Sequence, residues 1–445
     1  MNKEESSVAN SMYNLIKTLF PICRSITGNG VRKTLDIIKS YIPVKINEVA
    51  SGTQVFDWTI PEEWNIKDAY IKNSSGKKII DFKKSNLHVL NYSIPIHKKM
   101  SLEELKSHLF TLPEYPEWIP YLTSYYKKNW GFCLSHNQYK NLKEDSYEVC
   151  IDSELKKGFL TYGELFIKGQ IEKEILFTCY LCHPSMCNDS LSGVVLLTFL
   201  AQNLLKQNLK YSYRFLFIPE TIGAITWLAL NENNIKKINC GLVATCVGDK
   251  GEFTYKKTKS GSAYIDKVVE KVLIDSEVNY KAVDFFPWGS DERQFSSPGF
   301  NLDFGFLMKT QYASYDEYHT SADNLSFNDA NSLQHSLEQY LNIVFILEKD
   351  EKYINLNSKC EPQLGKRGLY NSIGGNKNLD DLKKAIFWLL SLSNGNTSLL
   401  DISMRSKLKF KIIFEAAELL QKHGVICEQN KELKFKRNYL NHKVV

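Results

Sequence analysis

The sequence lacks an uninterrupted apolar run of about 18 residues, an internal repeat and a low-complexity tract. The first absence excludes a membrane-spanning helix. The N-terminal stretch also has no apolar h-region and no small-residue cleavage site, so we expect an amphipathic helix there and not a signal peptide. A cytoplasmic location with no membrane partner follows as an expectation, and the ten cysteines should then be reduced.

The sequence also lacks a strong excess of positive or negative charge, because its formal net charge is only +6 over 445 residues. A balance this mild does not predict a nucleic-acid partner. The hydrophobic fraction of 43% and the charged fraction of 24% are typical of a globular protein. The length allows two or three domains, and formation of a homo-oligomer is left open.

The pattern of apolar residues changes twice along the chain and predicts three domains. Residues 1–51 and 109–355 alternate strand-like with helix-like segments, which is typical of an α/β fold with a mostly parallel sheet. Residues 52–108 contain short strand-like runs among turn residues and predict an inserted β-rich domain. Residues 361–445 have the texture of a winged helix, with a strand-like basic end over 425–445.

A candidate metal site begins at the end of the apolar run 174–182, which predicts a strand. His183 follows this strand directly, and Asp189 comes just before a helix predicted to start near Ser190. In parallel sheets, binding sites lie at the carboxyl ends of the strands, and His nitrogen with Asp oxygen is a standard zinc pair. An N-cap role for Asp189 and a structural role for His183 are the alternatives.

The same segment permits two other metal chemistries. Cys179, Cys182 and His183 form a C-x-x-C-H pattern, as in c-type haem attachment. We disfavour haem because the pattern lies in a strand predicted to be buried. A zinc cluster of Cys179, Cys182 and Cys187 is disfavoured because residues three apart on a strand point to opposite faces.

Two acidic residues end the next predicted strands. Glu220 follows the apolar run 214–219, where a carboxylate can act as a general base toward a water molecule. Asp249 follows the run 241–247 and is a further candidate ligand. A first-turn glutamate favoured by the helix dipole and a plain turn aspartate are the respective alternatives.

Two polar loops complete the set of candidates. His319 lies in a loop before the last helix of the α/β domain, where it could join the other metal ligands. Arg293 could bind a carboxylate or another anionic group of the substrate, because its planar guanidinium suits bidentate contacts. An internal ion pair with Asp291 or Glu292 is the alternative for Arg293.

The order His183, Asp189, Glu220, Asp249 and His319 resembles that of the zinc exopeptidases that use two adjacent metals. The whole chain is more similar still to a bacterial group of uncharacterised, aminopeptidase-like proteins, often encoded beside polysaccharide biosynthesis genes. Proteins of this group are described as having an inserted β domain and a C-terminal winged helix. The runs that carry this resemblance are 23–28, 123–126, 130–133, 289–294 and 318–325.

The resemblance implies a zinc-exopeptidase-like α/β/α sandwich. His183 and Asp249 would hold one zinc, Asp189 would bridge to a second zinc at His319, and Glu220 would be the general base. The chain departs from that pattern because Thr221 stands where the two-metal enzymes place a second glutamate ligand. The spacing from His183 to Asp189 is also unusually short. We therefore expect one firmly held zinc and a weak second site.

The resulting hypothesis is a zinc-dependent aminopeptidase-like hydrolase that acts on a peptide or another small amide. One alternative is a deacylase of an amino sugar or similar metabolite in polysaccharide biosynthesis. Another is a binding or regulatory protein that acts through the winged helix, whose basic residues are Lys407, Lys409, Lys411, Lys434, Lys436 and Arg437. The predicted helix 410–422 is largely apolar, so protein contacts are favoured over DNA.

Overall fold

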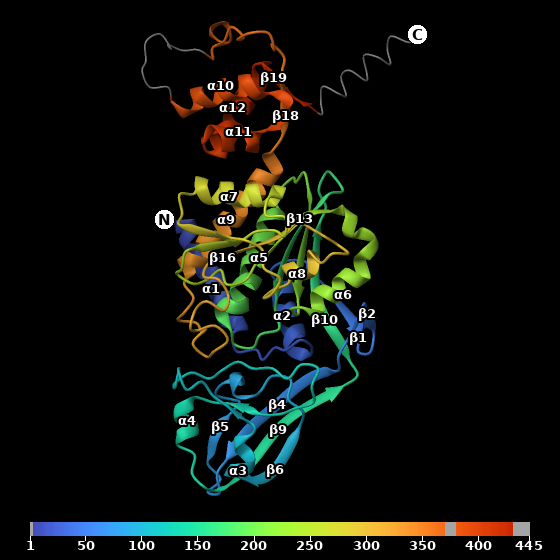
Figure 1. The fold of residues 1–445 in the computed structure, drawn as a ribbon, viewed down its shortest axis with the longest axis vertical. Coiled ribbons are helices and arrows are strands. Elements are labelled where there is room, and N and C mark those ends of the chain that lie inside the picture. Colours follow the sequence, from blue (N-terminus) through green and yellow to red (C-terminus); the bar gives the residue numbers. More distant parts are fainter. Residues whose placement is uncertain (1–2, 370–379, 430–445) are drawn as a thin grey trace. The chain divides into compact units, whose positions relative to one another are not determined.

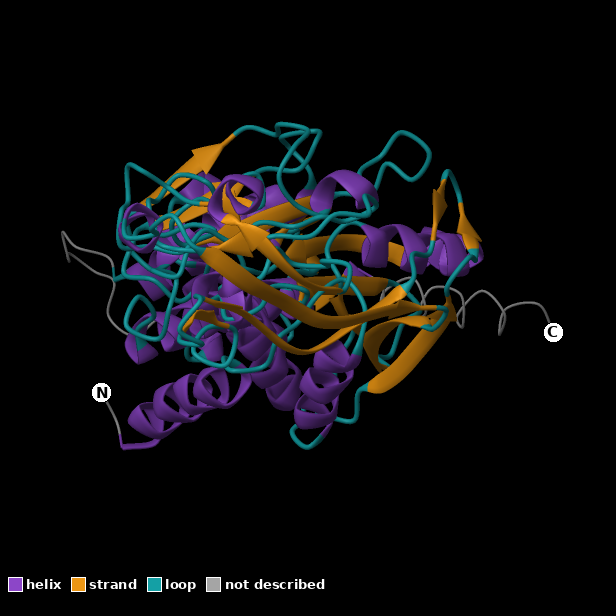
Figure 2. Ribbon diagram, turned by 90° about the horizontal axis from the view of Figure 1, so that it is seen from below, coloured by secondary structure: helices purple, strands orange, loops and turns teal. Residues whose placement is uncertain are grey.

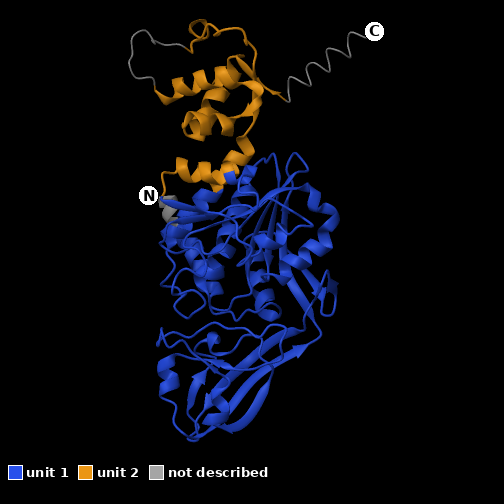
Figure 3. Cartoon of the chain, in the orientation of Figure 1, with its two compact units in different colours: residues 1–266, 279–340 blue, residues 267–278, 341–445 orange. Residues whose placement is uncertain are grey.

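The computed structural model describes residues 3–369 and 380–429, which divide into two compact units (Figure 3). Unit 1 comprises residues 1–266 and 279–340, and unit 2 comprises residues 267–278 and the chain from 341 onward. None of the ten cysteines forms a disulfide. Within the described ranges, no helix combines the length and the apolar character that crossing a membrane requires.

Unit 1 is built on a mixed eight-stranded sheet with helices on both sides (Figures 1 and 2). Its four central strands are parallel to one another, which confirms the expected α/β fold with a mostly parallel core. In spatial order, the strands are β1 (Lys45–Ala50), β10 (Phe159–Ile167), β12 (Ser212–Ile218), β11 (Glu174–Tyr180), β13 (Ile238–Val243), β16 (Phe304–Met308), β14 (Phe253–Lys256) and β15 (Tyr280–Val283).

The burial of these elements follows from their sequences. Every residue of β11 is buried, as expected for a central parallel strand with both faces covered. Helix α2 buries Val31, Thr34, Leu35 and Ile38, which share one face at helical spacing. Besides α2 (Asn29–Lys39), the long helices of unit 1 are α1 (Lys3–Leu19), α5 (Gly193–Leu204) and α6 (Ile222–Asn231), whereas α7 (Tyr264–Asp275) and α9 (Ala330–Lys349) are each divided between the two units.

A second, antiparallel sheet of four strands forms the β-rich part of unit 1. Its order is β5 (Lys78–Asp81), β4 (Glu63–Lys72), β9 (Ser146–Lys156) and β6 (Ile96–Ser101). Strand β9 lies outside the expected range 52–108, yet it pairs with both β4 and β6. The β-rich sheet therefore includes β9, a strand from later in the chain. Alternate residues of β9 are buried and pack into the hydrophobic core of this sheet.

Short elements connect the two sheets of unit 1. The hairpin of β2 (Gln54–Val55) and β3 (Trp58–Thr59) precedes β4. Strand β7 (Leu109–Phe110) pairs in parallel with β8 (Phe132–Cys133). Helices α3 (Leu102–Lys106) and α4 (His136–Lys140) each begin with a serine capping box.

Among its described residues from 350 onward, unit 2 has three α-helices and a three-stranded antiparallel sheet. The helices are α10 (Asp381–Leu392), α11 (Leu399–Ser406) and α12 (Phe410–Lys422), and the sheet order is β18 (Asn394–Ser398), β17 (Lys352–Asn355) and β19 (Ile426–Glu428). The sheet thus includes β17, which precedes the expected start at residue 361. Most of the strand-like end expected over 425–445 lies outside the described residues, as do Lys434, Lys436 and Arg437.

Candidate metal and catalytic site

His183 lies just beyond the carboxyl end of β11, as the sequence predicts. Its side chain is buried at 4% exposure, and its backbone oxygen accepts a hydrogen bond of 2.9 Å from Nε of Arg24. Burial lowers the pKa of His183 to about 4, so the ring is neutral at physiological pH. A neutral imidazole is the form that coordinates a metal.

Asp189 and His319 meet His183 at one point. Nε2 of His319 lies 3.0 Å from Oδ2 of Asp189, and Nε2 of His183 lies 3.8 Å from the same oxygen. One donor atom from each of the three residues falls within 4.8 Å of the other two. Asp189 is fully buried; burial alone would raise its pKa, but the two histidines hold it below the ordinary value. A buried carboxylate between two imidazoles is thus kept ionised.

The donor set fits a zinc ion. Ligands at about 2.1 Å from a tetrahedral zinc lie roughly 3.4 Å from one another. The separations of 3.0 Å and 3.8 Å bracket that value. Two imidazole nitrogens and one carboxylate oxygen are also the ligand types that zinc prefers, so the residues present suit one such ion.

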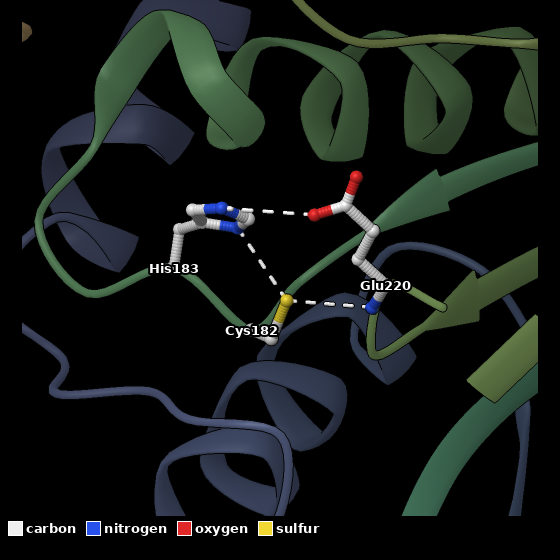
Figure 4. A group of neighbouring side chains, drawn as sticks. All are labelled: Cys182, His183 and Glu220. Atoms are coloured by element: carbon white, nitrogen blue, oxygen red, sulfur yellow. Dashed lines mark hydrogen bonds and ion pairs between the residues drawn. The ribbon is translucent and has the colours of Figure 1, made fainter. Parts of the chain in front are cut away.

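Glu220 faces this group from the end of the neighbouring strand β12. Its Oε2 lies 3.9 Å from Nε2 of His183, and its backbone amide donates to Sγ of Cys182 at 3.3 Å (Figure 4). Burial raises the pKa of Glu220 well above its usual range, and the carboxylates of Asp291 and Asp189 add to this effect. The Glu220 side chain keeps 23% exposure, so solvent can reach it.

Cysteine contributes little to the donor set. Cys182 joins His183 and Glu220 in a second group of potential ligands, whereas Cys179 and Cys187 belong to no such group within the described residues. Burial raises the pKa of the Cys182 thiol well above its ordinary value, so the thiol stays protonated. The geometry offers no support for the C-x-x-C-H or the three-cysteine arrangement.

Asp249 is not brought to the three donors. Its carboxylate accepts from the Thr310 hydroxyl at 2.6 Å, from the Gly251 amide at 2.7 Å and from Nδ2 of Asn188 at 2.9 Å. It belongs to no group of potential ligands among the described residues. Asp249 therefore hydrogen-bonds to the loop that contains Asn188 and does not contribute a ligand atom to the donor cluster.

Asp323 is a buried residue that sequence reasoning missed. Its two carboxylate oxygens accept from the backbone amides of Asn188 at 2.6 Å and Asp189 at 2.9 Å. Burial raises its pKa to about 7. These bonds hold the loop that presents Asp189. The run 318–325 contained Asp323, but no feature of the sequence linked it to a loop 134 residues earlier.

The segment 289–294 lies near Glu220, but its two acidic residues do not form the internal ion pair with Arg293 that was the alternative to substrate binding. Asp291 accepts from the Thr221 amide at 2.7 Å, and Glu292 forms a 2.6 Å ion pair with Lys256. Among the described residues, neither of them forms an ion pair with Arg293. The Arg293 charge lowers the pKa of Glu220, so the guanidinium lies within electrostatic range of it. Arg293 also acts to lower the pKa of Asp291 and Glu292, and its Nε is buried without a hydrogen-bond partner.

Aromatic rings pack against the two histidines. The Tyr318 ring stacks on His319 with centroids 4.0 Å apart, and the Tyr121 ring lies 5.1 Å from His319 and 5.2 Å from His183. The His319 side chain keeps 35% exposure, so this side of the group is open to solvent. The arrangement combines a candidate donor set for a cation with a carboxylate of high proton affinity.

Comparison with known proteins places this geometry in context. Residues 13–350 match the family described as a domain of unknown function (DUF4910), and residues 351–428 match a winged helix-turn-helix domain. A Clostridium acetobutylicum protein, named as a polysaccharide biosynthesis protein with an aminopeptidase-like domain, is 58% identical over 418 residues. That alignment covers 94% of this chain and 96% of the relative.

Solved structures give the same result for the fold. The crystal structure of a peptidase from Clostridium acetobutylicum aligns with a TM-score of 0.91 at 56% identity, covering 96% of this chain and 98% of that one. A zinc aminopeptidase from Bacillus subtilis aligns with a TM-score of 0.55 at 12% identity over 76% of this chain and 94% of that one. A peptidase M28 precursor from Shewanella amazonensis gives 0.54 at 12% identity over 78% and 96%. The last two show a shared fold, which confirms the expected zinc-exopeptidase-like sandwich.

Proposed function

The chain belongs to the DUF4910 family, and from this membership and its aminopeptidase-like fold we propose that it is a zinc-dependent hydrolase of amide bonds. One observation carries the proposal: His183, Asp189 and His319 converge on one point, with the Glu220 carboxylate 3.9 Å from His183. This is the arrangement that a metal-assisted hydrolysis with a general base requires.

His183, Asp189 and His319 would hold the ion, while Asp249 and Asp323 position the loop that carries Asp189. When bound, zinc polarises a carbonyl oxygen and makes a nearby water molecule more acidic. One ion is proposed, because the Thr221 hydroxyl is a poor zinc ligand and the Thr221 amide is bonded to Asp291.

Glu220 would accept a proton from the attacking water and deliver it to the leaving amine. In the metal-free protein, burial and the carboxylates of Asp291 and Asp189 raise the pKa of Glu220, which increases its affinity for the proton it would take from water. Arg293 would bind an anionic group of the substrate, because its charge has no internal ion pair with Asp291 or Glu292 among the described residues.

Metal analysis tests the donor set directly. We expect purified protein to contain about one zinc per chain, and His183→Ala and His319→Ala each to lower that content. His423→Ala is a matched control, because His423 is exposed at the end of α12. Unchanged zinc content in both site variants would contradict the proposal.

Removal of an acyl group from an amino sugar is a second candidate for the same site. The supporting observation is the name of the Clostridium acetobutylicum relative, which refers to polysaccharide biosynthesis. Assays of the zinc-loaded protein on amino-acid amides, dipeptides and N-acetyl sugars would separate the two. Turnover of none of these classes would count against both candidates.

A further inference from the structure

A second cavity, distinct from the donor cluster, lies between the start of α2 and the loop that follows β5. Its volume is about 540 Å³, and its lining includes Lys33, Lys67, Lys83 and Lys84. None of the lining residues, all of which the structure describes, is acidic. A concave space of this size accommodates a small molecule, and four ammonium groups around it favour an anion.

The charges of these lysines are mostly unpaired. Nζ of Lys83 donates to the Lys67 carbonyl at 2.7 Å. Within residues 3–369 and 380–429, the ammonium groups of Lys33, Lys67 and Lys84 have no acceptor. The neighbouring carboxylate of Asp81 is already engaged by Lys78 at 3.3 Å and by the Lys83 amide at 3.1 Å. Lys84 is close enough to help lower the pKa of Asp81, so this carboxylate offsets part of the positive charge, while Lys33 and Lys67 have no such partner among the described residues.

Backbone and neutral polar groups complete the cavity. Asn29 and Gly30, the first residues of α2, belong to the lining, and the Asn29 amide donates to Oδ1 of Asn65 at 2.8 Å. The dipole of this 11-residue helix adds partial positive charge to that of the lysines. Oδ1 of Asn86, another lining residue, is buried without a hydrogen-bond partner. Polar groups of this kind suit a ligand that also carries hydroxyl groups.

The cavity reaches the loops that carry the candidate metal ligands. Ser185 and Ser321 line it, each two residues beyond His183 or His319. The two histidines themselves do not line it. A ligand there would contact both loops without occupying the donor cluster.

From the cavity, the four lysines that line it and the absence of an acidic residue from its lining, we infer that this protein binds a small organic phosphate at this second site. The chemistry that fits is one or two phosphoryl groups on a hydroxylated molecule. This inference does not depend on the hydrolase proposal, because none of the residues that carry it belongs to the donor cluster.

Calorimetric titration of the full chain with inorganic pyrophosphate tests the site at low ionic strength. We expect saturable one-to-one binding, weakened about tenfold in Lys33→Ala/Lys84→Ala, because two of four charges are removed. The control is Lys127→Ala/Lys128→Ala, two exposed lysines that line a different pocket. We expect the affinity of this control to stay within about twofold of the wild type.

Other outcomes would overturn the inference. These are the absence of saturable binding, or equal weakening in both double variants. Lysine-dependent co-sedimentation with phosphatidylglycerol vesicles, without pyrophosphate binding, would instead assign the lysines to a lipid surface. Retention of a DNA fragment at moderate salt that depends on Lys33 and Lys84 would assign them to nucleic acid.

Discussion

The two sheets of unit 1 handle charge in opposite ways. At the carboxyl edge of the large sheet, Asp189, Asp291 and Glu292 are essentially fully buried. On the four-stranded sheet, the pair of Lys156 with Glu154 is more than half exposed and that of Lys72 with Glu148 keeps 28% exposure, while Glu63 is buried in an ion pair with Arg32. Burying ionised groups is costly unless they are paired. A cluster of buried carboxylates at one sheet edge therefore marks a site that is maintained for chemistry.

The largest contrast concerns Glu220 and a glutamate of the other sheet. Glu220→Gln should lower kcat about 10³-fold on any substrate that the wild type hydrolyses, because the general base is lost. Zinc content should not change. The matched variant Glu148→Gln alters an ion pair on β9 and should leave kcat unchanged. Equal kcat in Glu220→Gln and wild type would remove Glu220 from the mechanism.

The next contrast is between a buried and an exposed lysine–glutamate ion pair. Lys256 and Glu292 form an ion pair in which both side chains are 0% exposed. Lys256→Met should lower the free energy of unfolding by about 3–5 kcal/mol, because an unpaired buried carboxylate remains. Lys156→Met removes an exposed pair and should not shift the urea midpoint measurably. Similar midpoints for the two variants would show that burial does not decide the effect.

The pH dependence of stability should differ between aspartates. Burial raises the pKa of Asp291 to about 7, whereas an unfolded aspartate releases its proton near about 4. Between these values the folded state binds more protons, so stability falls as pH rises. In metal-free protein, Asp291→Asn should reduce the loss of urea midpoint between about pH 5 and about pH 8. Asp152→Asn, on the exposed face of β9, should leave that loss as in the wild type.

The smallest effect is expected from the winged helix. Helix α12 buries Phe410, Ile413, Ala416, Ala417 and Leu420, so it packs within unit 2, as its apolar sequence indicates. Lys409 at its start forms a 2.6 Å ion pair with Glu277. Gel-shift assays should therefore show no retention of DNA at moderate salt. A stable shift there would favour DNA binding over protein contacts.

The fold was largely predictable, because local patterns determine it. The largely apolar run 174–182 predicted a strand, which the structure contains over 174–180, and the helical periodicity of 410–422 predicted α12. The rule that sites lie at strand ends placed His183 at the site, whereas His319 lies in a late loop and was grouped with His183 and Asp189 from the order of the candidate ligands. Asp249 satisfied the same rule, but its carboxylate is taken up by Thr310 and Gly251.

What sequence could not provide were contacts between distant segments. Asp323 bonds to a loop 134 residues earlier, and Arg24 bonds to His183 across 159 residues. Strand β9 pairs with β4 although residues 109–145 separate it from the expected β-rich range. Such partners have no local periodicity, so they appear only when the tertiary structure is known.

The hydrogen bond from Arg24 to His183 bears on when the donor cluster can form during synthesis of the chain. Arg24 is fully buried and also donates to the Leu19 carbonyl at 2.8 Å, so it ties the end of α1 to the loop that carries His183. A nascent chain emerges N-terminus first, and the donor set closes only when His319 has left the ribosome. The complete three-residue donor set for the proposed zinc therefore forms only on an almost complete α/β domain.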